Sequence, residues 1–225
     1  MSSLRNVTLT LVGLILLMVA TRSGLAGDLH LQDASWAIFF VGGFYLGNRW
    51  RWAFPALMLA AVAIDWVAIR YYGVSNYCVT LAYGFLVPAY AALWLGGSWV
   101  RRHGSFDGLG LLALGAGALI SASVCFLLTN GSFYWLGNRG PAPTFDGWMA
   151  NVAVWYWPFV RVCLAYVATA ALGHVALGHV LVSIPGTNYA ERWLVRLPHN
   201  HKAEKGTCIP ASSVRDRQCS AAHWR

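Results

Sequence analysis

Long apolar runs separated by short polar breaks dominate this chain. Six of these runs are predicted to be helices, covering residues 6–21, 35–48, 53–70, 79–99, 109–129 and 154–182. Several approach or exceed the roughly 18–20 apolar residues that cross a bilayer as a helix. The run 35–48 is shorter, and flanking residues of the membrane interface are expected to extend its helix. The pattern predicts an all-α integral membrane protein, a bundle of six transmembrane helices, and excludes a soluble globule.

The first and last runs each need a further judgement. The first run resembles a signal peptide, with Ala26 as a small residue near a cleavage site. Because five more apolar runs follow, a retained first helix is expected instead. The last run is predicted to open with the aromatic residues Trp155–Trp157 and with Pro158. Proline is tolerated in the first turn of a helix, and the aromatic side chains suit a membrane interface.

Composition and charge agree with a membrane protein. The chain has 225 residues, is 58% hydrophobic and only 11% charged, and carries a net charge of +8. The basic residues gather near the N-terminus, in the breaks after 48 and 99, and in the C-terminal tail, whereas the opposite breaks contain only Arg22, Arg70 and Arg139. The positive-inside rule makes the arginine-rich side cytoplasmic. Both termini are therefore predicted inside, and the charge is no sign of nucleic-acid binding.

Two regions are expected along the chain. Residues 1–185 form the six-helix membrane domain, and residues 186–225 form a basic cytoplasmic tail that is partly disordered. Five cysteines occur without a CxxC pair, so a zinc site or redox dithiol has little support. No Walker A sequence, catalytic triad pattern or HExxH occurs either. If the protein transports a solute, the energy must come from a partner or from an ion gradient.

Cys78 is the most informative residue for function. It lies in a short polar and aromatic break between two apolar runs. A thiol at a membrane–water boundary can bind a soft metal or attack a ligand, whereas a thiol inside an apolar run usually only packs. The breaks at 21–34, 71–77 and 130–149 are predicted to face outward. The third is the longest, and long loops are often functional.

Asp65 is the second candidate. It lies about five residues before the outer end of its helix, roughly 8 Å below the interface. An acid at that depth needs a partner or a cavity. Arg161 is expected at a similar depth on the last helix and is the candidate partner. Two interpretations stay open, an ion pair that only locks two helices together and a direct contact with a ligand.

Other residues could complete a site around Cys78. Tyr83 lies about one and a half turns into the fourth helix and could point into the same pocket, or it is an ordinary interfacial tyrosine. Tyr77 and Tyr134 could belong to an aromatic wall for a large planar ligand, or to an aromatic belt. His30 is either solvated or part of a loop that closes over Cys78.

Small residues recur at four-residue spacing in the last two apolar runs. The rows are Ala113, Gly117 and Ser121, and Ala165, Thr169 and Gly173. Such rows allow helices to approach closely. Packing within this protein and docking of a partner membrane protein are both compatible with them.

The segment Asp65-Trp-Val-Ala-Ile-Arg-Tyr-Tyr-Gly-Val-Ser-Asn-Tyr-Cys78-Val-Thr-Leu-Ala-Tyr83, together with the predicted topology, carries a resemblance. Residues 1–185 resemble the substrate-binding S-components of energy-coupling factor transporters. Among these, the chain is similar to the BtuM family of solitary cobalamin-uptake proteins of Gram-negative bacteria. One departure is that the first helix lacks the Ala-x-x-x-Ala row through which S-components often dock their membrane partner. A solitary mode is consistent with that departure.

The resemblance implies a function and a site. It implies uptake of cobalamin across the bacterial inner membrane, with cobalamin as the transported ligand and no other cofactor. It also implies that Cys78 ligates cobalt and that Asp65, Tyr83 and Arg161 are pocket residues open to the periplasm. An energising module is one partner, although the protein could act alone in the lipid membrane. The alternatives are an S-component for another vitamin or metal, a thiol-dependent membrane enzyme, and a structural membrane subunit.

A thiolate is a soft axial donor for cobalt, and this chemistry makes sense independently of the resemblance. Cobalt in a corrinoid is held by four equatorial nitrogens, which leaves two axial positions. A cysteine ligand could displace the nucleotide base of the corrinoid and labilise the opposite ligand. Removal of cyanide from cyanocobalamin by Cys78 is therefore expected to accompany binding.

Overall fold

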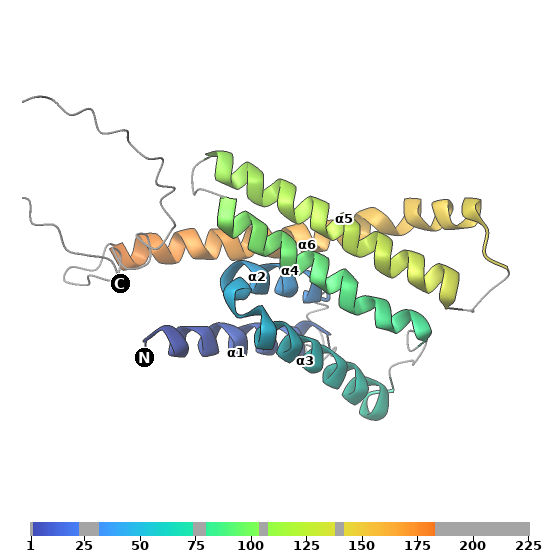
Figure 1. The fold of residues 1–225 in the computed structure, drawn as a ribbon, viewed down its shortest axis with the longest axis horizontal. Coiled ribbons are helices and arrows are strands. Elements are labelled where there is room, and N and C mark those ends of the chain that lie inside the picture. The colour runs from blue at the N-terminus through green and yellow to red at the C-terminus, as the bar shows by residue number, and fades with distance from the viewer. Residues whose placement is uncertain (1, 23–31, 74–79, 104–107, 138–141, 183–225) are drawn as a thin grey trace, which may run out of the picture.

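The computed structural model describes the chain except for residues 1, 23–31, 74–79, 104–107, 138–141 and 183–225. In the described part every regular element is a helix (Figure 1). The elements are α1 (Ser2–Arg22), α2 (Ser35–Leu46), η2 (Gly47–Arg49), α3 (Trp50–Tyr71), η4 (Leu81–Phe85), α4 (Leu86–His103), α5 (Gly108–Leu136) and α6 (Phe145–Val182). The predicted all-α class is confirmed.

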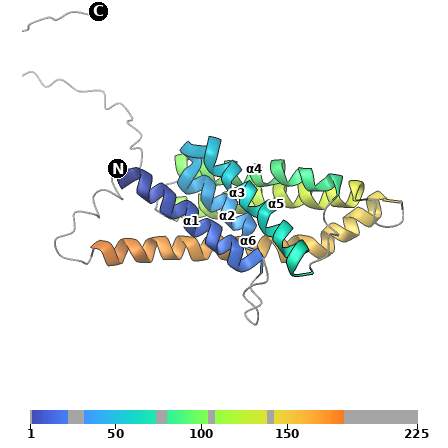
Figure 2. The same ribbon diagram turned by 90° about the horizontal axis from the view of Figure 1, so that it is seen from below.

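Five helical segments of the described chain are long and apolar enough to cross a membrane. They are Leu4–Arg22, Ser35–Tyr71, Leu81–His103, Leu109–Leu136 and Phe145–Ala176. The protein is therefore a multi-pass membrane protein. The second segment joins α2, η2 and α3, and the chain reverses direction at η2 (Figures 1 and 2). With 12 residues, α2 is only about 18 Å long, shorter than the roughly 30 Å hydrocarbon core.

The bundle has two ends that differ in the residues they present. At the Asp65 end, α1 and α3 finish, α2 and η4 begin, and α5 and α6 meet. At the Arg101 end, α2 and α4 finish and α3 and α5 begin, and the start of α1 and the end of α6 lie there too (Figure 1). Arg101 donates from Nη1 to the carbonyl oxygens of Phe44 at 2.8 Å and Tyr45 at 3.0 Å. It thereby satisfies backbone acceptors in the last turn of α2.

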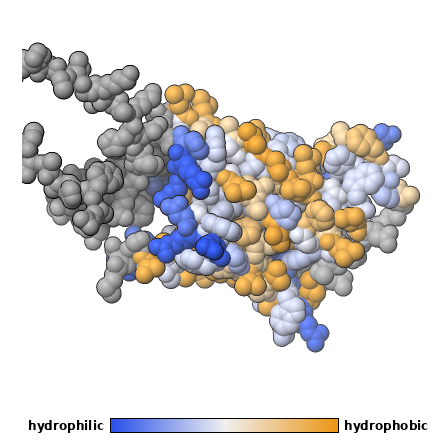
Figure 3. All heavy atoms as spheres, viewed as in Figure 1, coloured by the Kyte–Doolittle hydropathy of each residue, from blue (hydrophilic) through white to orange (hydrophobic). Residues whose placement is uncertain are grey.

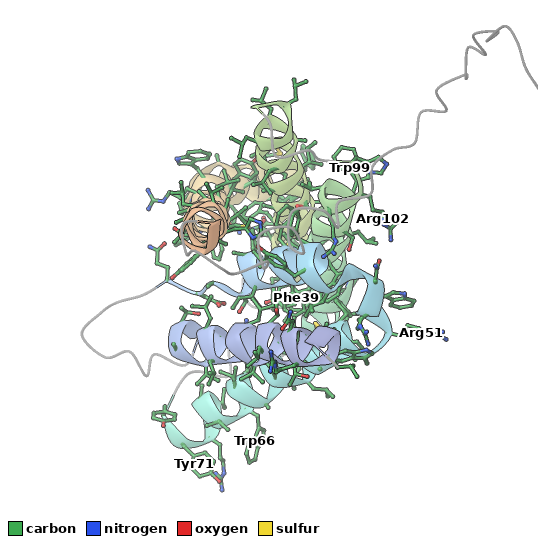
Figure 4. The ribbon with its side chains drawn as sticks, turned by 90° about the vertical axis from the view of Figure 1, so that its left-hand side faces the viewer. Phe39, Arg51, Trp66, Tyr71, Trp99 and Arg102 are labelled. Atoms are coloured by element: carbon green, nitrogen blue, oxygen red, sulfur yellow. The ribbon has the colours of Figure 1, made fainter. Side chains whose placement is uncertain are left out.

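The surface of the bundle suits lipid over most of its length. Large apolar side chains such as Leu59, Leu95 and Leu112 are exposed. Figure 3 shows orange apolar side chains along one face and a blue hydrophilic cluster toward the Arg101 end. In the view along the bundle, Phe39 lies in the interior while Trp66 and Tyr71 point outward from α3 (Figure 4). The apolar exterior is what a bilayer-embedded protein requires.

The α2–α4 contact is the closest in the core, and glycine makes it possible. A Cβ on Gly43 would overlap the backbone of Trp94, and a Cβ on Gly97 would overlap the backbone carbonyl of Phe40. Small residues let helix backbones approach in this way, as in other membrane helix pairs. Both glycines lie in the half of their helices nearer the Arg101 end.

The predicted long outer loop 130–149 is wrong. Helix α5 continues to Leu136 and α6 begins at Phe145, so most of that segment is helical. Its polar side chains are satisfied within and between the helices: Ser132 donates to the carbonyl of Thr129 at 3.0 Å, and Trp148 donates to Asn130 Oδ1 at 3.1 Å. Polar residues therefore do not end these helices.

The predicted start of the last helix is also wrong. Pro158 lies well inside α6 rather than in its first turn. Proline removes one backbone hydrogen bond and clashes with the preceding turn. Figure 2 shows α6 bent partway along, and Pro158 accounts for the bend. Membrane helices tolerate such a proline because neighbouring helices satisfy the freed groups.

Candidate functional site

Arg22, the last residue of α1, forms a two-pronged ion pair with Asp65 on α3. Its Nε lies 2.5 Å from Asp65 Oδ1 and its Nη2 lies 2.7 Å from Asp65 Oδ2. The side chains are 12% and 23% exposed. This planar geometry matches the fork of a guanidinium to both carboxylate oxygens and gives a stronger, better oriented pair than a single contact.

The partner of Asp65 is therefore Arg22, and the prediction of Arg161 in this role is wrong. Helix α1 packs directly against α3, whereas α6 packs mainly against α5 and α2. Arg161 is exposed on α6 and takes part in none of the ion pairs among the residues that the structure describes. Arg161 was expected at a depth similar to that of Asp65, but the neighbour of α3 is α1 rather than α6.

The other terminal nitrogen of Arg22 links further elements. Nη1 donates to Ser35 Oγ at 2.8 Å, to Tyr90 Oη at 3.1 Å and to Asp33 Oδ2 at 3.2 Å. Asp33 Oδ1 in turn accepts from the backbone nitrogen and the hydroxyl of Ser35, at 2.9 Å and 2.5 Å. One guanidinium thus ties the end of α1 to the start of α2, to α3 and to α4.

Tyr83 completes this network from η4. Its hydroxyl donates to Asp65 Oδ2 at 2.6 Å. The turn that presents it begins at Thr80, whose Oγ1 accepts from the backbone nitrogen of Ala82 at 3.2 Å. The polar capping of a short 3-10 turn fixes the direction in which Tyr83 leaves the backbone. Tyr83 and Asp65 therefore meet, which favours the pocket interpretation of Tyr83 over that of an ordinary interfacial tyrosine.

A cavity of about 410 Å³ opens beside the network at the Asp65 end. Arg22, Asp33, Asp65, Tyr83 and Tyr90 supply its polar side. Aromatic and aliphatic side chains supply most of the rest, together with Thr129 and Asn130; the other lining residues are Trp36, Ala68, Ile69, Leu86, Phe126, Phe133 and Phe159. An apolar hollow with a few convergent polar groups is the usual form of a small-molecule site.

The aromatic wall is not built from the tyrosine that the sequence suggested. Tyr134 does not line the cavity; its hydroxyl bonds the backbone carbonyl and nitrogen of Thr144, at 3.1 Å and 3.3 Å. It joins the ends of α5 and α6 instead. The neighbouring Phe133 lines the cavity, together with Trp36 and Phe159. Successive helical residues point about 100° apart, which explains why only one of the two faces inward.

Three predicted site residues, His30, Tyr77 and Cys78, lie outside the described residues. Of the remaining predictions, the structure brings Asp65 and Tyr83 together but leaves Arg161 and Tyr134 apart from them. Within the described ranges no group of three or more His, Cys, Asp or Glu side chains could hold a metal ion. Cobalt ligation by Cys78 stays a prediction.

Arg22, Asp33 and Tyr90 were missed as site residues by sequence reasoning. A signal for Arg22 existed, because this residue ends the first apolar run on the same side of the membrane as Asp65. Asp33 and Tyr90 carried no comparable signal, since an acid near a helix start and an aromatic residue within a membrane helix are both common. Their roles follow only from the packing of α2 and α4.

Comparison with known proteins does not assign the chain to a family. No model of a known protein family matches it, and no curated protein matches it.

Proposed function

We propose that this protein binds a corrinoid such as cobalamin at the Asp65 end and carries it across the bacterial inner membrane. The observation that carries the proposal is the cavity of about 410 Å³ beside the Arg22–Asp65–Tyr83 network. The cavity combines an aromatic wall, which suits a planar macrocycle, with polar groups, which suit the polar side chains around the edge of that macrocycle. In the sequence, Cys78 lies between α3 and η4, five residues before Tyr83.

In this proposal the Asp65 end faces the periplasm. The exposed arginines Arg51, Arg101 and Arg102 belong to the opposite end, which supports a cytoplasmic assignment of that end. The reversal of the chain at η2 supports counting α2 and α3 as separate spans, which gives six spans with both termini inside. Six spans with both termini inside is the architecture that the resemblance to S-components implies.

Cys78 supplies the sulfur ligand to cobalt in the proposed complex. It precedes Thr80 by two residues and Tyr83 by five, and Tyr83 lines the cavity. The nucleotide base of the corrinoid dissociates from cobalt, the thiol loses its proton, and the thiolate donates an electron pair to the vacated axial position of Co(III). With cyanocobalamin, the opposite cobalt–carbon bond then breaks, and cyanide leaves with the electron pair of that bond and takes up the proton of the thiol as HCN. Cobalt keeps its oxidation state.

The size of the cavity limits how the ligand can sit. Pockets that enclose a drug-sized molecule hold roughly 300–1,000 Å³. A corrinoid exceeds a drug-sized molecule, so only part of it enters the cavity of about 410 Å³, and the rest lies beyond its mouth. The same volume favours a second candidate, an S-component-like carrier for a smaller vitamin, in which Cys78 has no role in binding.

Absorption spectra of the purified full chain separate the two candidates. We expect the wild type to bind hydroxocobalamin and cyanocobalamin and to shift their spectra, because a thiolate changes the axial field of cobalt. Cys78→Ala should lose the shift, whereas Cys208→Ala in the tail should keep it. A wild type that binds no corrinoid would refute the proposal, and identical spectra for wild type and Cys78→Ala would refute the role of the thiol.

Uptake itself is tested by growth of a bacterium that lacks its own inner-membrane cobalamin importer and depends on external vitamin. We expect the wild-type chain to restore growth and Cys78→Ala to restore less. Repeating the assay in a strain without an energising module tests whether the protein acts alone. Failure in both strains would contradict a transport function.

A further inference from the structure

The charges of the cavity point to the kind of group that the ligand presents there; this inference rests on the proposed function. Arg22 is the only basic side chain among the described residues that line the cavity. Its Nε and both Nη atoms already donate to acceptors of the protein: Asp65, Asp33, Ser35 and Tyr90. A guanidinium with its donors engaged in this way is poorly placed to hold an anionic ligand group.

The two carboxylates outnumber the cation. Arg22 contributes one positive charge, and Asp33 and Asp65 contribute one negative charge each, so the described lining carries a net charge of −1. Both oxygens of Asp65 accept from Arg22, and Oδ2 also accepts from Tyr83. The surplus negative charge is therefore associated with Asp33.

Asp33 is also the more accessible of the two acids. Its side chain is 46% exposed, against 23% for Asp65. Its contact with Arg22 is a single one, at 3.2 Å. A carboxylate oxygen has about two acceptor directions, so Oδ2 retains capacity for a second donor. Asp33 is thus an acceptor at the edge of the cavity, ready for a hydrogen-bond donor of the ligand.

We propose that Asp33 makes the site select ligands that present an amide or another hydrogen-bond donor, and reject ligands with a carboxylate at the same position. A corrinoid with its side chains amidated is such a ligand. Replacing one amide NH₂ by a carboxylate oxygen removes the donor and sets two negative charges against each other. Rejection by like charge is a common source of specificity between molecules of the same shape.

The experiment compares hydroxocobalamin with its isomeric monocarboxylic acids, in each of which one side-chain amide is hydrolysed. Dissociation constants are measured with the purified full chain by competition. We expect at least one acid isomer to bind the wild type about tenfold more weakly than the amide, a difference that corresponds to about 1.4 kcal/mol. Asp33→Asn keeps an oxygen for the Ser35 backbone and should reduce that ratio to below about threefold.

The matched control is Asp146→Asn, an exposed acid in the first turn of α6 that does not line the cavity. It should leave the tenfold ratio unchanged. If Asp33→Asn fails to fold, the two dissociation constants of the wild type are measured at low and at high salt instead. Salt screens a half-exposed charge, so the ratio between them should fall as salt is added. Equal binding of the amide and every acid would overturn the inference and leave corrinoid uptake standing. No binding of any of them would overturn both.

Discussion

The two ends of the bundle are built from largely the same helices, yet the hollows that the described residues line there differ in volume and polarity. At the Asp65 end the cavity measures about 410 Å³ and contains three charged side chains. At the Arg101 end a hollow of about 60 Å³ is mostly apolar, and there Tyr45 bonds His174 Nδ1 at 2.8 Å. Arg101 itself contacts carbonyl oxygens of α2 rather than another charge.

Side-chain size explains this difference. Near the Arg101 end Gly43 and Gly97 let α2 and α4 touch backbone to backbone. Near the Asp65 end the residues that line the cavity include large ones, among them Trp36, Phe133 and Phe159. Tight packing stabilises one end, and the space left at the other end is available to a ligand. The cavity in this fold is thus a place where polar groups are concentrated beside less tightly packed helices.

Replacing Arg22 with methionine should give the largest loss of stability and of ligand binding at the Asp65 end. Asp65 would keep its charge in a partly enclosed site without its cation, and breaking such a pair costs about 3 kcal/mol. We expect a marked loss of thermal stability in detergent and loss of ligand binding. Arg161→Met is the matched control and should change stability by less than about 0.5 kcal/mol. Equal losses in the two variants would contradict the assignment of the ion pair.

Replacing Gly97 with alanine tests the closed end. The new methyl group would overlap the carbonyl of Phe40, and such overpacking costs about 1–3 kcal/mol. Gly173→Ala is the control, because a Cβ there meets nothing within 4 Å. Thermal unfolding followed by size-exclusion chromatography measures both. Equal stability of the two variants would show that the α2–α4 contact is looser than described.

The sequence could predict depth along a helix but not which helices are neighbours. The six apolar runs correspond to the six α-helices of the described chain, and Asp65 lies in the enclosed polar position that its depth required. Depth suggested Arg161 as its partner, whereas the packing of α1 on α3 makes Arg22 the partner. Hydropathy also could not show that the polar residues around Asn130 remain helical, because their hydrogen bonds reach residues on the same and the next helix.

Replacing Tyr83 with phenylalanine should give the smallest effect and the most specific one. The change removes a 2.6 Å hydrogen bond to Asp65 but keeps the ring that lines the cavity. A hydrogen bond to a charged group contributes about 1.5–3 kcal/mol, and the ion pair with Arg22 remains. We expect a stability loss of about 1.5 kcal/mol and weaker ligand binding. Tyr134→Phe, which loses a hydroxyl outside the cavity, should leave binding unchanged. If Tyr134→Phe weakened binding as much as Tyr83→Phe, the site would extend along the end of α5 and the start of α6. The cavity would then not be the whole of the difference between the Asp65 end and the Arg101 end.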